Sequence, residues 1–194
     1  LKESQSGFSY DLTAKSERQM PAGALLFKHG TTEQAQFDPE IQTTDFGVHL
    51  RYAPNEKFYQ GASYRTPILN KYPIFNLWYN IGVKGAIGGE YNYHSVQAKV
   101  EKVFYFSPLG WSQVVAEGGR IFGTVPFPLL KIHRANQTYA YQLESYNLMN
   151  FLEFVSDKYA AVSVTHNFGG FFFNRIPLLD RLKWREVVSF KGLW

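Results

Sequence analysis

The sequence predicts an all-β protein, in particular an antiparallel transmembrane β-barrel, from three observations. Apolar and polar residues alternate over several stretches, which is the period of a β-strand. Several of these stretches reach about ten residues, enough for a tilted strand to cross a bilayer, whereas strands of globular proteins centre near five or six. Aromatic residues make up 18% of the chain, and amphipathic rings concentrate where an apolar phase meets water.

The composition excludes several other classes of protein. No window supplies the roughly 18 consecutive apolar residues of a membrane-spanning helix. The mean hydropathy of -0.27 agrees with a barrel, because the strands of a barrel alternate. The net charge of +4 comes from scattered Lys and Arg, so no nucleic-acid partner is expected. The chain has no cysteine, which excludes disulfides and thiol chemistry.

Alternation and turn residues define the expected order of elements. Strands are predicted at residues 6–15, 44–52, 74–84, 91–106, 111–122, 159–168 and 184–194, with a short strand at 24–29 and a return strand at 57–66. Residues 30–42 are expected to form a loop. Residues 176–182 are amphipathic and are expected to form a turn, lying either in a membrane interface or packed on the protein.

The two faces of these strands differ in chemistry. One face carries aromatic residues mainly toward the strand ends and small residues such as Ala98 and Ala116 between them, where a soluble core would contain more Leu and Ile. The other face is polar along its length, as a water-filled lumen permits. Lys99, Glu101 and Glu117 are expected to face that lumen as solvated, paired charges rather than as acid–base groups.

The longest connection, residues 122–157, separates two predicted strands. Loops of this length inside a domain are functional, disordered or misassigned. The stretch is rich in Leu, Tyr and Phe, which argues against disorder. We therefore expect an ordered insertion that folds back onto the structure carrying it.

Several segments resemble a known family. The segments GGRIFGTVPFPLLKIH, NQTYAY, SYNLMNFLEFVSDKY and NFGGFFFNRIPLLDRLKWREVVSFKGLW resemble the C-terminal barrel of a family typical of Bacteroidota. Its members join an N-terminal carboxypeptidase-regulatory-like domain to an outer-membrane barrel similar to the bacterial surface-antigen barrels of BamA-type assembly factors. The resemblance implies a location in the outer membrane of a Gram-negative bacterium.

Barrels of this type usually have about sixteen strands, and the pattern here predicts about eight. The chain also begins at Leu1, without an initiator Met or a signal peptide. We therefore expect a mature or truncated chain that forms a C-terminal portion of a larger barrel, without its N-terminal domain and closing strands. The alternative is a complete eight-stranded barrel.

The resemblance also implies a role for the long connection. In assembly-factor barrels a late loop folds into the lumen as a lid, and residues 122–157 resemble that loop by position. The usual Val-Arg-Gly-Phe tip is replaced by His133-Arg134-Ala135-Asn136, with Arg134 in the place of the lid arginine. The residues expected to make lid or lumen contacts are Arg120, His133, Arg134, Asn136, Tyr139, Tyr146, Asn147 and Asp157.

The function implied by the resemblance is non-enzymatic assembly, insertion or export of surface proteins, with outer-membrane lipid and other outer-membrane or periplasmic proteins as partners. The alternative is a structural scaffold or a pore within a larger complex. A barrel lipase is a third possibility, since Ser, His and Asn meet in space rather than in sequence, although no Ser is singled out near a His. No cofactor or metal is expected, because the five histidines lack metal-ligand spacing.

Overall fold

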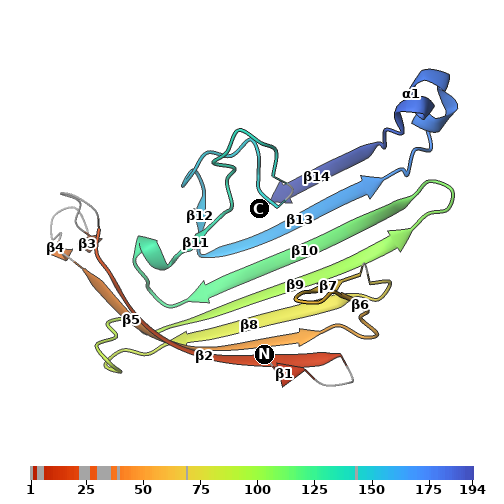
Figure 1. Cartoon of the computed structure of the whole chain (residues 1–194). Coiled ribbons are helices and arrows are strands. Elements are labelled where there is room, and N and C mark those ends of the chain that lie inside the picture. Colours follow the sequence, from red (N-terminus) through yellow and green to blue (C-terminus); the bar gives the residue numbers. More distant parts are fainter. Residues whose placement is uncertain are drawn as a thin grey trace.

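The computed structural model describes residues 2–3, 7–21, 27–29, 36–38, 40–68, 70–142 and 144–194. Its main feature is one curved antiparallel sheet of eight strands, in the order β1-β2-β5-β8-β9-β10-β13-β14 (Figure 1). This confirms the all-β prediction. Within the described ranges, no helix has the length and apolar character needed to cross a membrane.

The strands of the main sheet follow the predicted alternation closely. They are β1 (Lys2–Glu3), β2 (Phe8–Gln19), β5 (Ile41–Tyr52), β8 (Ile74–Gly82), β9 (Tyr93–Tyr105), β10 (Trp111–Phe122), β13 (Lys158–Asn167) and β14 (Val187–Leu193). The remaining elements are short and lie in the connections between these strands. They are β3 (Phe27–His29) paired with β4 (Gln36–Asp38), β6 (Phe58–Gln60) paired with β7 (Arg65–Pro67), β11 (Lys131–Ile132) paired with β12 (Val155–Ser156), the 3-10 turns η1 (Phe127–Leu129) and η2 (Phe173–Arg175), and the helix α1 (Pro177–Leu182).

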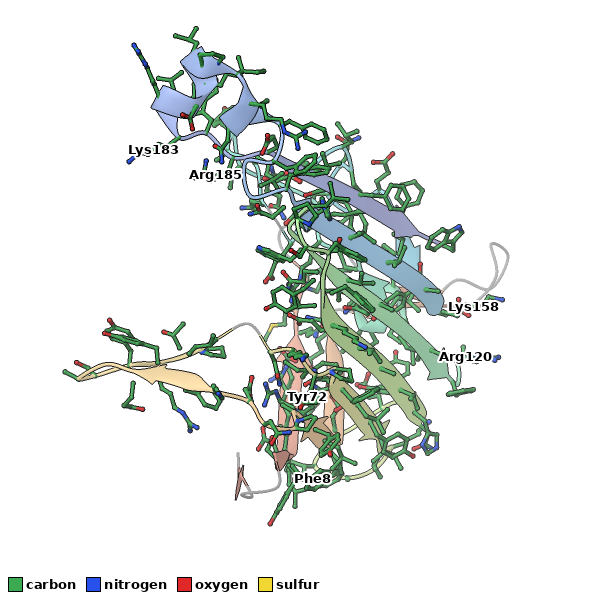
Figure 2. The ribbon with its side chains drawn as sticks, turned by 90° about the vertical axis from the view of Figure 1, so that its right-hand side faces the viewer. Phe8, Tyr72, Arg120, Lys158, Lys183 and Arg185 are labelled. Carbon is green, nitrogen blue, oxygen red and sulfur yellow. The ribbon has the colours of Figure 1, made fainter. Side chains whose placement is uncertain are left out.

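The prediction of a single return strand at residues 57–66 is wrong. This stretch forms the β6–β7 hairpin, which projects away from the main sheet (Figure 2). The hairpin is closed within itself by the Gly61 N–H bond to the Tyr64 carbonyl at 2.9 Å and by Arg65, whose guanidinium lies 3.6 Å from the centre of the Phe58 ring. Its faces are not distinct in the sequence, so it has no apolar side to add to the sheet.

Two smaller predictions also need correction. The loop expected at 30–42 contains β4 and the first residues of β5; residues 30–35 lie outside the described residues, as do residues 24–26 of the strand expected at 24–29. The turn expected at 176–182 is the helix α1. It begins at Pro177, whose fixed φ suits a first helical position, and ends before Lys183, which adopts the left-handed conformation.

The strand register gathers apolar side chains into continuous rows on one face of the sheet. One such row crosses β5, β8, β9, β10 and β13 through Leu50, Leu77, Ala98, Gly118 and Ala160. This apolar face is exposed, and its large exposed side chains include Phe8, Tyr10, Leu12, Phe46, Tyr52, Phe75, Leu77, Tyr79 and Phe104. The buried apolar residues in the described part of the chain are few: Ile41, Ala53, Tyr93, Val103, Ala135 and Tyr159. The hydrophobic residues of the strands are therefore not gathered into a core within this sheet.

Candidate functional site

Residues 123–157, here called the connection, pack on the polar face of the sheet beside β10, β13 and β14. The ammonium of Lys191, on the polar face of β14, donates to the carbonyls of Ser145 at 2.7 Å and Gln142 at 3.4 Å. The ring of His133 meets the ring of Tyr159, on β13, edge to face at 5.2 Å between centroids. The β11–β12 pair forms the base of the connection (Figure 1). The connection is therefore held to the sheet by specific polar and aromatic contacts.

Tyr159 is the centre of this contact, and its position depends on two residues of β10. Its hydroxyl donates to Glu117 Oε1 at 2.8 Å. Its ring lies against Gly119, where a Cβ would be 2.7 Å from the ring atom Cε1. Gly119 and Tyr159 are cross-strand partners, so the absence of a side chain at residue 119 lets the ring lie close to the sheet and reach Glu117.

His133 is the most buried charged or titratable residue of the connection, with 5% of its surface exposed. Its Nε2 lies 3.0 Å from Ser156 Oγ. Burial lowers the pKa of His133, and the charge of Lys131 lowers it further, while Glu117 acts in the opposite direction. Burial also raises the pKa of Tyr146, to which Glu117 adds. Near neutral pH the His133 imidazole and the Tyr146 phenol are therefore both uncharged, under the influence of the negative charge of Glu117.

The rest of the connection is ordered by its own amide side chains. Asn136 Nδ2 donates to Asn147 Oδ1 at 2.7 Å, and Asn147 Nδ2 donates to the Gln142 carbonyl at 2.9 Å. The Tyr146 N–H donates to the Arg134 carbonyl at 2.8 Å and closes the tip of the connection. The connection thus presents a preformed surface, on which Tyr139 and Leu148 are fully exposed.

Among the described residues, the ion pair of Arg134 lies inside the connection. Arg134 Nη1 lies 2.7 Å from Glu144 of the connection itself, and both side chains are exposed. The register pairs Arg120 with Val96 and Lys158 on the apolar face, so its side chain is on the opposite side of the sheet from the connection. Asp157 contributes through its backbone, since its carbonyl accepts the Ile121 N–H at 2.7 Å.

Of the three charged residues expected on the polar face, the structure brings Glu117 to the connection. Lys99 and Glu101 form a separate group, with Lys99 Nζ 3.9 Å from Glu101 Oε2. Gln113 Nε2 also donates to Glu101, at 2.6 Å. Both charged side chains are partly exposed, so this group is a solvated ion pair on the polar face.

Two serine–histidine contacts are present, neither of which the sequence singled out. Ser156 meets His133 as described, and Ser112 Oγ lies 2.6 Å from His166 Nδ1, with His166 Nε2 2.9 Å from the Leu109 carbonyl. Ser112 is 8% exposed, and the other partner of His166 is a backbone carbonyl rather than a carboxylate. This pair therefore satisfies two polar groups on the apolar face and does not form a triad of the Ser-His-Asp type. Across the described ranges, no three His, Cys, Asp or Glu side chains are placed to hold a metal ion.

Lowering the pH below about 6.5 is expected to loosen the connection. His133 has a lowered pKa when packed, and a released imidazole titrates near 6.5. Between the pKa of packed His133 and that of the released imidazole, the released state binds more protons than the packed state. The contribution of His133 to the stability of the packed connection is therefore complete above about pH 6.5 and is lost as the pH falls through the lowered pKa. Hydrogen exchange of residues 129–156, compared at about pH 7.5 and about pH 5.5 and corrected for intrinsic rates, should rise by at most about tenfold per pH unit, the limit for one proton.

The control for this experiment is His133→Gln, which keeps a hydrogen-bonding side chain but does not titrate. In that variant the corrected exchange should no longer depend on pH in this range. An unchanged pH dependence would assign the effect to another group.

The fold and the site define a class of protein, namely an all-β chain with one antiparallel sheet and an ordered insertion on its polar face. The chain belongs to the family of unknown function DUF5686, as its C-terminal domain, whose family model matches residues 15–194. No curated protein and no solved structure gives a significant match.

Proposed function

We propose that this chain is part of a transmembrane β-barrel in the outer membrane of a Gram-negative bacterium, with its apolar face in lipid and its polar face toward a lumen that the connection occupies. The observation that carries the proposal is the difference between the two faces. The apolar face leaves side chains such as Leu12 (68% exposed) and Phe46 (44% exposed) uncovered, whereas the polar face is the one on which the connection packs. Lipid is the solvent that such an exposed surface suits.

The distribution of rings on the apolar face supports this orientation. Phe8, Tyr52 and Phe75 lie at one end of β2, β5 and β8, and His94 and Phe122 lie at the other end of β9 and β10. Between them the side chains are mostly small or aliphatic, such as Leu50, Leu77, Ala98 and Gly118, although Tyr10, Tyr79 and the cations Arg120 and Lys158 also lie there. Aromatic girdles flanking an aliphatic band are characteristic of outer-membrane barrels.

The function proposed for this barrel is non-enzymatic assembly, insertion or export of surface proteins, similar to that of BamA-type barrels joined to a carboxypeptidase-regulatory-like domain. Such a barrel acts through an exposed strand edge that templates an incoming strand. The ordered connection supports this proposal, because its preformed tip offers Tyr139 and Leu148 as contact groups inside the lumen.

A pore or a structural scaffold is the second candidate, and one observation favours it. Thr13 and Lys15, on the polar face of β2, are exposed, while the hydrogen bonds between connection and sheet described above involve the far side, β10 to β14. A lumen that the connection fills only in part would let solutes pass.

The test is photocrosslinking in cells from a crosslinking amino acid at residue 139 or 148 of the full-length protein, with newly made proteins pulse-labelled. A matched control has the crosslinker at residue 146, which is half-buried inside the connection. An assembly role predicts several newly made outer-membrane proteins captured from 139 and 148, lost during the chase, and absent from 146. One stable neighbour and no transient client would instead identify a scaffold.

The pore is tested separately by conductance in planar bilayers. Replacing residues 137–145 by a short Gly/Ser link keeps the closing contact between Arg134 and Tyr146 while removing the tip. A pore should conduct before this change and conduct more after it. A barrel that is silent in both forms would exclude the pore.

A further inference from the structure

Two cations face each other on the apolar face, at the end of the sheet where the connection begins. Arg120 of β10 and Lys158 of β13 are direct cross-strand partners, and both side chains are exposed. Figure 2 shows both at the same end of neighbouring strands. Among the residues that the structure describes, no carboxylate forms an ion pair with either of them. Like charges placed directly opposite each other destabilise a sheet, so this arrangement favours a bound anion.

The surface next to Arg120 and Lys158 consists of short apolar side chains. The guanidinium of Arg120 lies 4.7 Å from the centre of the Phe122 ring, which holds it at the strand end. Toward the middle of the sheet, the next rows consist of small and aliphatic side chains: Ala98, Gly118 and Ala160, then Val100, Ala116 and Val162. A cationic pair that continues into a band of short apolar side chains matches a molecule with an anionic head and a hydrocarbon chain.

We infer that Arg120 and Lys158 bind the phosphate of an anionic lipid headgroup, with an acyl chain of the same lipid lying over the Ala98–Gly118–Ala160 row. A guanidinium presents paired N–H donors to phosphate oxygens, and an ammonium adds a second charge-assisted hydrogen bond. A soluble anion would bind the two cations but leave the apolar rows uncovered, whereas a lipid binds the cations and also covers the apolar rows. This inference rests on the proposed function, because it requires the apolar face to lie in a bilayer.

Trp194 provides a local reporter for such a lipid. Its backbone exchanges hydrogen bonds with Ala160, at 2.9 and 3.0 Å, and its indole lies over Gly192, also on the apolar face. The side chain is 72% exposed. A brominated acyl chain on the Ala160 row would therefore lie close enough to quench its fluorescence.

The experiment uses the full-length protein in phosphatidylcholine bilayers that contain a brominated phosphatidylglycerol or, for comparison, a brominated phosphatidylcholine. The quenching lost on Trp194→Phe defines the local signal. The phosphatidylglycerol should quench this signal at a lower mole fraction than the phosphatidylcholine. The double variant Arg120→Gln/Lys158→Gln should reduce that preference by about tenfold or more, as expected from two cations near an anionic lipid. The matched control Lys183→Gln/Arg185→Gln removes the same charge at the opposite end of the sheet (Figure 2) and should leave the preference unchanged.

The outcomes separate the lipid site from the barrel proposal. Equal quenching by the two lipids, or an equal loss in the Lys183/Arg185 control, would overturn the site while leaving the apolar face in lipid. Abolition of the preference by millimolar inorganic phosphate would show a soluble-anion site and would also overturn it. No local quenching by either lipid would show that the apolar face is not in the bilayer, which contradicts the proposed function itself.

Discussion

Replacing Gly119 with leucine is expected to release the connection from the polar face of the sheet. A Cβ at this position would lie 2.7 Å from the Tyr159 ring and 3.2 Å from the Val96 carbonyl, and a larger side chain would occupy the place of the ring. Tyr159 would then lose its bond to Glu117 and its edge-to-face contact with His133. Overpacking costs about 1–3 kcal/mol, and each lost hydrogen bond adds about 1 kcal/mol.

Hydrogen exchange of residues 129–156 in the membrane-embedded protein measures this release. The matched control is Gly118→Leu, one residue earlier in β10. Its Cβ would meet only the Tyr159 carbonyl, at an ordinary 3.4 Å, and its side chain would point to the apolar face. Exchange in the connection should rise in the Gly119 variant alone. A similar rise in both variants would mean that general damage to β10, and not displacement of Tyr159, frees the connection.

Replacing Gly110, in the turn between β9 and β10, with alanine is expected to lower the yield of folded protein. Its φ is +92°, and an added Cβ would lie 1.9 Å from the Asn167 carbonyl oxygen. The obstacle is backbone, so it cannot rotate away, and the Trp111–Asn167 end of the β10–β13 ladder would have to open. Gly110→Ala therefore combines a left-handed backbone cost of roughly 1–3 kcal/mol with overpacking of similar size.

The fraction of folded protein recovered in membranes, measured by protease resistance, should fall sharply for Gly110→Ala. The variant Gly85→Ala separates the conformational cost of a left-handed alanine from the contact with the Asn167 carbonyl. Gly85 has a similar φ of +85°, but an added Cβ would meet nothing within 4 Å, so this variant carries the conformational cost alone. If the two variants lost folded protein equally, the contact with Asn167 would have no part in the defect.

The long strands and their two faces were predictable because alternation is a local property. Residues 111–122 were predicted as a strand and form β10 with those bounds, and residues 91–106 differ from β9 by two residues at one end and one at the other. In the middle of both strands every second residue is small or apolar, as at Val96, Ala98 and Val100 or at Val114, Ala116 and Gly118, so each strand shows its own apolar side without knowledge of its neighbours. Where the faces are indistinct, as at 57–66, the prediction failed.

The contacts of the connection were not predictable in the same way. The resemblance to a lid loop grouped Arg120 with the connection. The alternation of β10 already places it with Gly118 on the apolar face, and the structure puts Lys158 opposite it. The partners of Tyr159 and Lys191 carry no sequence signal, since they lie 42 and 46 residues away in Glu117 and Ser145.

By itself, the sequence determined the all-β class, most strand positions and the side of the sheet that each strand residue faces, because these follow from a period of two along the chain. Only the tertiary structure decided which strands are neighbours, that 57–66 forms a separate hairpin, and that the connection packs through Tyr159, His133 and Lys191. Those features depend on register and on packing between distant segments, where a missing side chain at Gly119 matters as much as the groups that make contact.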